Sequence, residues 1–124
     1  MKKFTIEISR LKKGPKELAY QLPITAKVIQ RLPGKDRPDY FLAKLENNLV
    51  WKAHPEMKPK EITHLVLCTK YKEHHIDPEM NDVLIAIAYV IDESLLNENT
   101  LNFNKCKYIA LGEASVLKKW NIFK

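Results

Sequence analysis

The longest apolar stretch of the chain runs from Val83 to Ile91 and is bounded on each side by an aspartate. Its nine residues include five β-branched side chains, and the stretch is too short to cross a bilayer as a helix. A short apolar run of this composition predicts a strand that is covered on both faces.

The two faces of this predicted strand differ in bulk. Side chains alternate between the faces of a strand, so the run divides into a bulky set and a slim set. The bulky set is Val83, Ile85, Ile87, Tyr89 and Ile91, and the slim set is Leu84, Ala86, Ala88 and Val90. The slim face predicts close packing behind it, which either a narrow barrel interior or a docked helix would provide.

Shorter stretches of alternating or β-branched residues predict the remaining strands. Phe4–Ser9 alternates strictly between apolar and polar residues, which is typical of a strand with one face in water. The other predicted strands are Ile24–Arg31, Tyr40–Glu46, Leu49–Ala53, Ile62–Thr69 and Cys106–Ser115.

The connections between these strands carry their own signals. Asn47 and Asn48 predict a tight two-residue turn between two of the strands. Pro15 favours the start of a short helix that reaches Gln21. The segment 92–105 keeps several large apolar residues, so we expect it to fold onto the body of the protein; these residues are Leu95, Leu96, Leu101 and Phe103.

These elements predict a mostly β protein with a single domain over residues 1–124. The architecture is an antiparallel β-barrel or a strongly bent sheet of about six to seven strands, with one or two short helices. We favour the barrel, and an α+β fold is the alternative.

Charge is distributed unevenly along the chain, whose net charge is +6. Residues 1–62 carry 14 lysines and arginines against 7 acidic residues, whereas residues 63–124 carry 7 against 8. The basic half is either a surface for an acidic partner or a means of keeping the protein soluble.

The ends of the chain and its cysteines indicate a compartment. Glu7 interrupts the apolar block that a signal peptide would need, and no apolar stretch is long enough to span a membrane. We therefore expect a cytoplasmic protein without a membrane partner. Cys68 and Cys106 lie in strand-like segments and have no neighbouring cysteine at metal-binding spacing, so we expect two buried thiols.

Several classes of enzyme are excluded by residues that the chain lacks. Glycine occurs only at positions 14, 34 and 112, so neither a phosphate-binding loop nor a dinucleotide fingerprint can form. None of the three serines lies in a Gly-x-Ser-x-Gly motif, and neither His-Glu-x-x-His nor Cys-x-x-Cys occurs. We assign no catalytic residue and expect no cofactor.

A candidate partner-binding surface lies in the basic segment 24–53. Pro33 and Gly34 predict a projecting turn in this segment, and the strands beside it carry aromatic residues next to lysines. The candidate residues are Arg31, Lys35, Arg37, Tyr40, Lys44, Trp51 and Lys52.

The histidines are the weak candidates for a metal site. His74 and His75 stand with Asp77 in an acidic loop, and imidazole with carboxylate is a workable ligand set. Adjacent residues of an extended segment point to opposite sides, however, so an exposed polar loop explains them equally well. His64 shares the predicted strand face of Ile62 and Val66, where a hydrogen-bonded core histidine is expected.

Three functions remain open. The first is a small non-catalytic binding protein whose partner is another protein, with an antitoxin-like or immunity-like role as one form of it. The second is a nucleic-acid-binding β-barrel that uses the basic segment 24–53, and the third is a metal-dependent enzyme centred on His64 or on His74 and His75.

Overall fold

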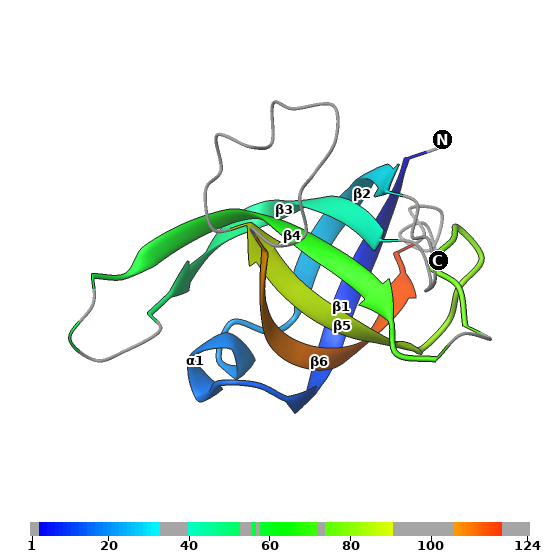
Figure 1. Cartoon of the computed structure of the whole chain (residues 1–124). Helices are drawn as coiled ribbons and strands as arrows, with labels where there is room; N and C mark the ends of the chain where they lie inside the picture. The colour runs from blue at the N-terminus through cyan, green and yellow to red at the C-terminus, as the bar shows by residue number, and fades with distance from the viewer. Residues whose placement is uncertain are drawn as a thin grey trace, which may run out of the picture.

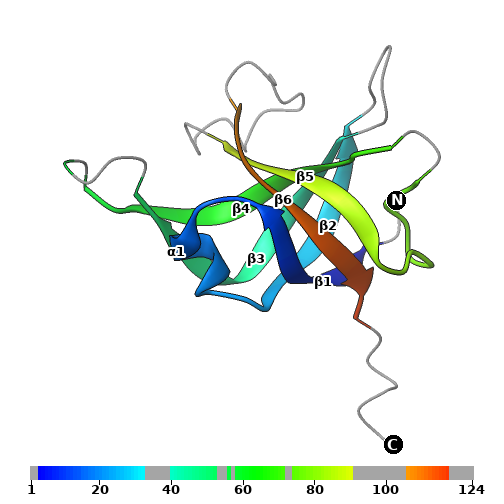
Figure 2. The ribbon, with the colours of Figure 1, turned by 90° about the horizontal axis from the view of Figure 1, so that it is seen from below.

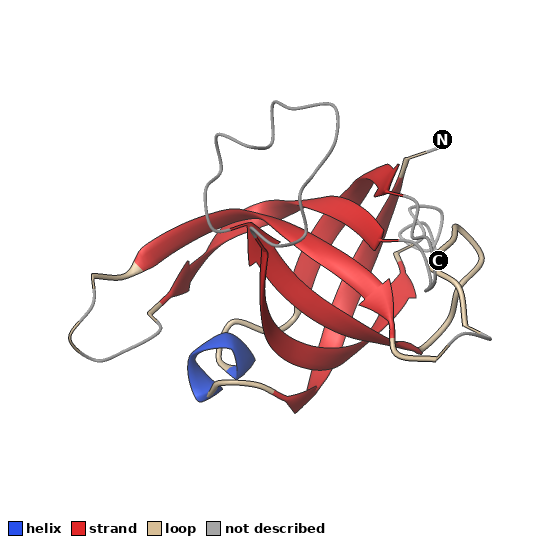
Figure 3. Ribbon diagram, viewed as in Figure 1, coloured by secondary structure: helices blue, strands red, loops and turns tan. Residues whose placement is uncertain are grey.

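The structure is a computed structural model that describes residues 3–32, 40–52, 56, 58–71, 74–90 and 106–117. Strands dominate it, with one short helix in the described part of the chain (Figures 1 and 3). In chain order the elements are β1 Phe4–Lys13, α1 Lys16–Ala19, β2 Ile24–Leu32, β3 Tyr40–Trp51, β4 Lys60–Thr69, β5 Val83–Val90 and β6 Cys106–Val116.

The six strands form a closed antiparallel barrel in which each strand pairs with the next along the chain. β6 closes the barrel by pairing with β1, and the curvature of the strands around the common interior is visible in Figure 2. Closure leaves no unpaired edge strand in the barrel. The predicted barrel is confirmed, with six strands.

The seam between β1 and β6 depends on a close approach of the two backbones. The register shifts twice here, between Ile8 and Arg10 and again between Leu11 and Lys13. Gly112 lies opposite Leu11, and a Cβ atom at Gly112 would stand 2.8 Å from the carbonyl oxygen of Arg10. Glycine therefore allows the barrel to close at this point.

The barrel interior is occupied by apolar side chains from all six strands and by Leu18 of α1, which is 2 % exposed. The members of the bulky set within β5 face inward, and Ile85 and Ile87 are completely or almost completely buried, whereas Ile91 lies outside the described residues. The slim set faces outward, so the expectation that the slim face could line a narrow interior is wrong. Small inward-facing residues come from other strands instead, namely Ala26, Ala43, Ala110 and Ala114.

The predicted turn at Asn47 and Asn48 is also wrong. Both residues lie within β3, which continues from Tyr40 to Trp51. Between Lys44 and Leu49 the pairing advances five residues on β3 but only two on β4. An irregularity of this kind lets a strand bend and continue where a tight turn would have ended it.

This irregularity changes the face on which His64 lies. Ile62 belongs to the interior core, but Leu65 does too, so the alternation breaks between them. His64 pairs with the exposed Lys44, is half-buried, and has Nδ1 2.8 Å from the Thr63 hydroxyl. The sequence predicted that His64 shares the face of Ile62, and this prediction is wrong.

Candidate functional site

The outer face of β1, β2 and β3 carries a row of polar residues that the strand register places side by side. Thr5 of β1 pairs with Lys27 of β2, and Lys27 pairs with Lys44 of β3. Each of these residues alternates with a buried core residue of its own strand, which directs the row outward. Two lysines thus stand directly opposite each other on neighbouring strands.

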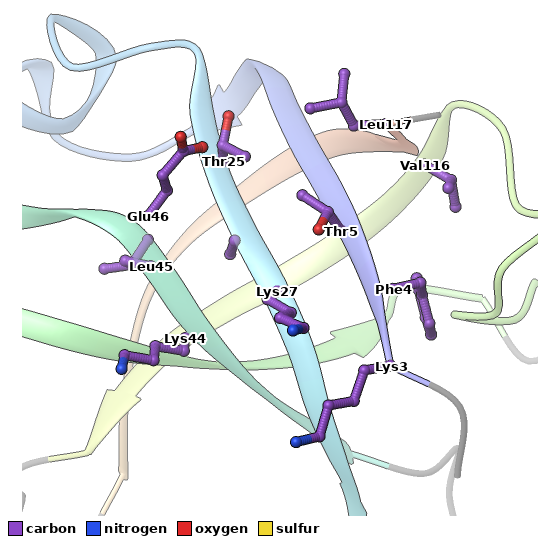
Figure 4. Close-up of a pocket in the computed structure, with 11 residues that line it drawn as sticks. Lys3, Phe4, Thr5, Thr25, Lys27, Lys44, Leu45, Glu46, Val116 and Leu117 are labelled. Carbon is purple, nitrogen blue, oxygen red and sulfur yellow. The ribbon is translucent and has the colours of Figure 1, made fainter. Parts of the chain in front are cut away.

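This row lies in a hollow of about 840 Å³ on the outside of the barrel. Lys3 adds a third ammonium group to the hollow, and Leu117 leaves the end of β6 beside it, where its backbone N–H donates to the carbonyl oxygen of Thr5 at 2.8 Å. Figure 4 shows the lining residues, which are Lys3, Phe4, Thr5, Thr25, Ala26, Lys27, Lys44, Leu45, Glu46, Val116 and Leu117.

The described residues form no ion pair that would neutralise the lysines or the glutamate of the hollow. Lys27 and Lys44 are exposed, and neither makes an ion pair with any of the described residues. Glu46 lies two residues beyond Lys44 on β3 and makes no ion pair with the described residues either. Figure 4 shows the three lysines toward one end of the hollow and Glu46 with Thr25 toward the other. The hollow therefore has a positive end, formed by the lysines, and an opposite end with one negative and one neutral polar side chain.

The neighbouring part of the outer face is apolar. A second row crosses the barrel from Gln30 through Leu42, Val66 and Ala88 to Tyr108. Leu42, Val66 and Val90 are 5 %, 2 % and 2 % exposed although they face away from the barrel interior. We call these three residues, with the partly buried Ile29, Tyr40, Ala88 and Cys106 that pack against them, the outer apolar cluster.

The cysteines lie on this outer side of the barrel. Cys106 belongs to the outer apolar cluster, and desolvation by burial raises the pKa of its thiol. Both cysteines are half-buried, where the sequence predicted buried thiols, and they are not joined in a disulfide. A thiol with a raised pKa is a weaker nucleophile at neutral pH, which does not favour a catalytic role for Cys106.

The candidate partner-binding residues from the sequence are dispersed over the structure. Lys44 lies in the hollow, and Arg31 and Lys52 are exposed near the ends of β2 and β3. Tyr40 is half-buried in the outer apolar cluster. Lys35 and Arg37 lie outside the described residues, as does the segment 92–105.

Trp51 packs against the interior core, and its buried indole N–H has no hydrogen-bond partner in the described part of the chain. Trp51 is half-buried at the end of β3, seven residues along the strand from Lys44. The structure thus places Lys44 and Trp51 in different surroundings.

Sequence reasoning missed most of the hollow. Lys3, Thr5, Thr25 and Lys27 were not recognised as candidates, although the last three each occupy a polar position between apolar ones. The alternation marks these positions as outward-facing, but only the register of β1 with β2 and of β2 with β3 shows which of them are neighbours.

The described residues contain no cluster of three or more histidine, cysteine or acidic side chains that could hold a metal ion. His74 and His75 are exposed, and the ring of His74 meets the edge of the Tyr71 ring at a centroid distance of 5.6 Å. The Asp77 carboxylate accepts a hydrogen bond from the backbone N–H of Glu79 at 2.8 Å, as is typical of a turn.

In comparisons with known protein families, curated proteins and solved structures, nothing matches the chain. Within the described ranges, no helix has the length and apolar character that crossing a membrane would require.

Proposed function

We propose that this chain is a non-catalytic, cytoplasmic binding protein whose partner is another protein, held on the outside of the barrel. The observation that carries this proposal is the lysine-lined hollow over β1, β2 and β3. Apolar side chains occupy the barrel interior, so the exterior is the surface on which a ligand would be recognised. Open hollows with unpaired charges attract partners of the opposite charge.

A protein partner fits this hollow better than a nucleic acid does. Nucleic-acid surfaces combine positive charge with exposed aromatic rings on which bases stack. Among the described lining residues the aromatic one is Phe4, which is 9 % exposed and belongs to the core. Glu46 also lies at one end of the hollow, where it would repel a phosphate backbone.

The proposal is tested by capturing partners from the source cell with tagged protein, with and without nuclease. We expect at least one protein to be captured in both conditions. Its capture should be lost in the double variant Lys27→Thr with Lys44→Thr, because both ammonium groups would be removed while β propensity is retained. Partners that disappear on nuclease treatment would instead support the nucleic-acid alternative.

A matched control keeps the net charge of the double variant but leaves the hollow intact. Lys13→Thr with Lys107→Thr serves this purpose, because both lysines are exposed strand residues that do not line the hollow. Capture should persist in this control. Equal loss in both double variants would mean that overall charge, and not the hollow, retains the partner, and would contradict the proposal.

A further inference from the structure

We propose that the hollow binds an extended acidic segment of the partner, with Lys27 and Lys44 together forming the site for its carboxylates. This inference rests on the proposed function and names the chemistry of the partner at the same site. It draws on three observations: the direct opposition of the two lysines, the polarity of the hollow, and the apolar side of its rim.

The opposition of Lys27 and Lys44 favours the binding of an anion between their ammonium groups. Directly opposed residues on antiparallel strands have Cβ atoms about 5 Å apart, and like charges in such pairs destabilise a sheet. No carboxylate among the described residues pairs with either lysine. A carboxylate placed between the two ammonium groups would accept charge-assisted hydrogen bonds from both and relieve their repulsion.

Lys3 extends the positive end, and the Thr5 hydroxyl stands in the same row as Lys27. Lys3 lies two residues before Thr5 on the same outward-facing side of the chain. A second carboxylate two residues along an extended peptide would be displaced by about 6.6 Å, which is a distance that a long lysine side chain can span. The site therefore suits acidic residues at alternate positions.

The other end of the hollow sets the direction and the limit of the acidic run. Glu46 and Thr25 lie there, about 6.6 Å along β3 and β2 from the lysine row, because each stands two residues from its lysine. A bound segment that is acidic at the lysine end of the hollow and polar or basic at the Glu46 end complements the charge at both ends. Leu117, which is 47 % exposed, offers an apolar contact at the rim.

The same polarity argues against a polyanion of uniform charge. A nucleic-acid strand that followed the hollow would bring phosphates to Glu46 as well as to the lysines. Charge juxtapositions of this kind are what allow an interface to reject wrong partners. Glu46 is thus the residue that we expect to discriminate between acidic peptides and nucleic acids.

The test uses defined probes, so it does not depend on identifying the natural partner. A synthetic peptide with glutamate at alternate positions followed by a lysine is titrated into isotope-labelled protein at 50 mM salt. Its matched peptide carries glutamine for glutamate, and an oligouridylate of similar length serves as the nucleic acid. We expect the glutamate peptide to shift the amide signals of Thr5, Lys27 and Lys44, and the glutamine peptide to bind at least about tenfold more weakly.

The variants then assign the binding to particular side chains. The double variant Lys27→Thr with Lys44→Thr should bind the glutamate peptide about tenfold more weakly than the unaltered protein does. The control Lys13→Thr with Lys107→Thr should bind it with an affinity within about twofold of the unaltered protein. Raising the salt to 200 mM should weaken binding by about two- to fivefold, because exposed charges are then screened beyond about 7–8 Å. Glu46→Gln should increase the affinity for the oligouridylate more than the affinity for the glutamate peptide.

Several results would overturn the inference. Absence of shifts in the hollow at millimolar glutamate peptide would do so, as would equal binding of the glutamine peptide. Tighter binding of the oligouridylate than of the glutamate peptide to the unaltered protein would assign the hollow to nucleic acid. Correct folding of each variant is checked by its amide spectrum, so that loss of binding is not mistaken for loss of structure.

Failure of this inference is distinguishable from failure of the proposed function. If the glutamate peptide binds through Lys27 and Lys44 but no protein is captured from the cell, the acidic site stands and the proposed function falls. If a protein is captured independently of nuclease but the glutamate and glutamine peptides bind alike, the proposed function stands and the acidic site falls.

Discussion

The outer apolar cluster and the hollow both include residues of β3, yet the two parts of the barrel exterior have opposite character. β3 contributes Leu42 to the outer apolar cluster and, two residues further on, Lys44 to the hollow. Both side chains point away from the interior, but Leu42 is 5 % exposed whereas Lys44 is exposed. On β3 the boundary between the two parts therefore falls within the strand, between Leu42 and Lys44.

The two parts are expected to contribute differently to the stability of the fold. Burial of apolar side chains stabilises a fold, so the outer apolar cluster contributes to stability in addition to the interior core. The lysine row does the reverse, because its opposed ammonium groups repel each other without a compensating ion pair from the described residues. A position that costs stability in the isolated protein is a candidate for a position retained for binding.

The largest expected effect on stability comes from placing the same charge in the outer apolar cluster and in the hollow. Val66→Asp should destabilise the fold by about 3 kcal/mol or more, because the carboxylate would be buried among apolar side chains. Lys44→Asp should change stability by less than about 1 kcal/mol, because the site is exposed. Urea denaturation of the two variants measures the difference, and similar midpoints would show that the outer apolar cluster is open to water.

A second test adds bulk to the outer apolar cluster without adding charge. Ala88 pairs with Val66 on one side and Tyr108 on the other, and it is half-buried. Ala88→Leu should destabilise the fold by roughly 1–3 kcal/mol, because the added methylene groups meet packed neighbours. Thermal unfolding checks this value, and an unchanged melting temperature would mean that Ala88 has space above it.

The smallest expected effect concerns the lysine row. Lys27→Thr with Lys44→Thr should leave stability unchanged or raise it by up to about 1 kcal/mol, because a like-charge pair is removed from an exposed face. The gain should shrink as salt is added, since screening already weakens the repulsion. Urea denaturation at low and high salt measures it, with Lys13→Thr and Lys107→Thr as the control. A clear loss of stability would mean that these lysines support the fold itself.

Much of the barrel followed from local pattern. The run Val83–Ile91 predicted a buried strand, and β5 over Val83–Val90 is that strand with its bulky set inside. Strict alternation identified β1, and Pro15 indicated a short helix, although α1 ends at Ala19 and not at Gln21. These predictions succeeded because a buried strand face imposes its two-residue period on the sequence whatever its partners are.

The errors came from places where neighbouring strands override the local pattern. Asn47 and Asn48 have turn-forming side chains, but pairing of β3 with β4 on both sides of them keeps the strand continuous. The same irregularity moves His64 to the outer face, which alternation counted from Ile62 could not foresee. Irregular pairing depends on two strands at once, so one strand's sequence does not encode it.

The sequence by itself determined the strands, the apolar interior and the supply of basic residues in the first half of the chain. The tertiary structure alone decided which lysines meet. Lys3, Lys27 and Lys44 are separated by 41 positions from first to last, and they come together only because β1, β2 and β3 pair in one register. A shift of one residue in that register would send every side chain of a strand to the opposite face, so the candidate site depends on the register in which these three strands pair.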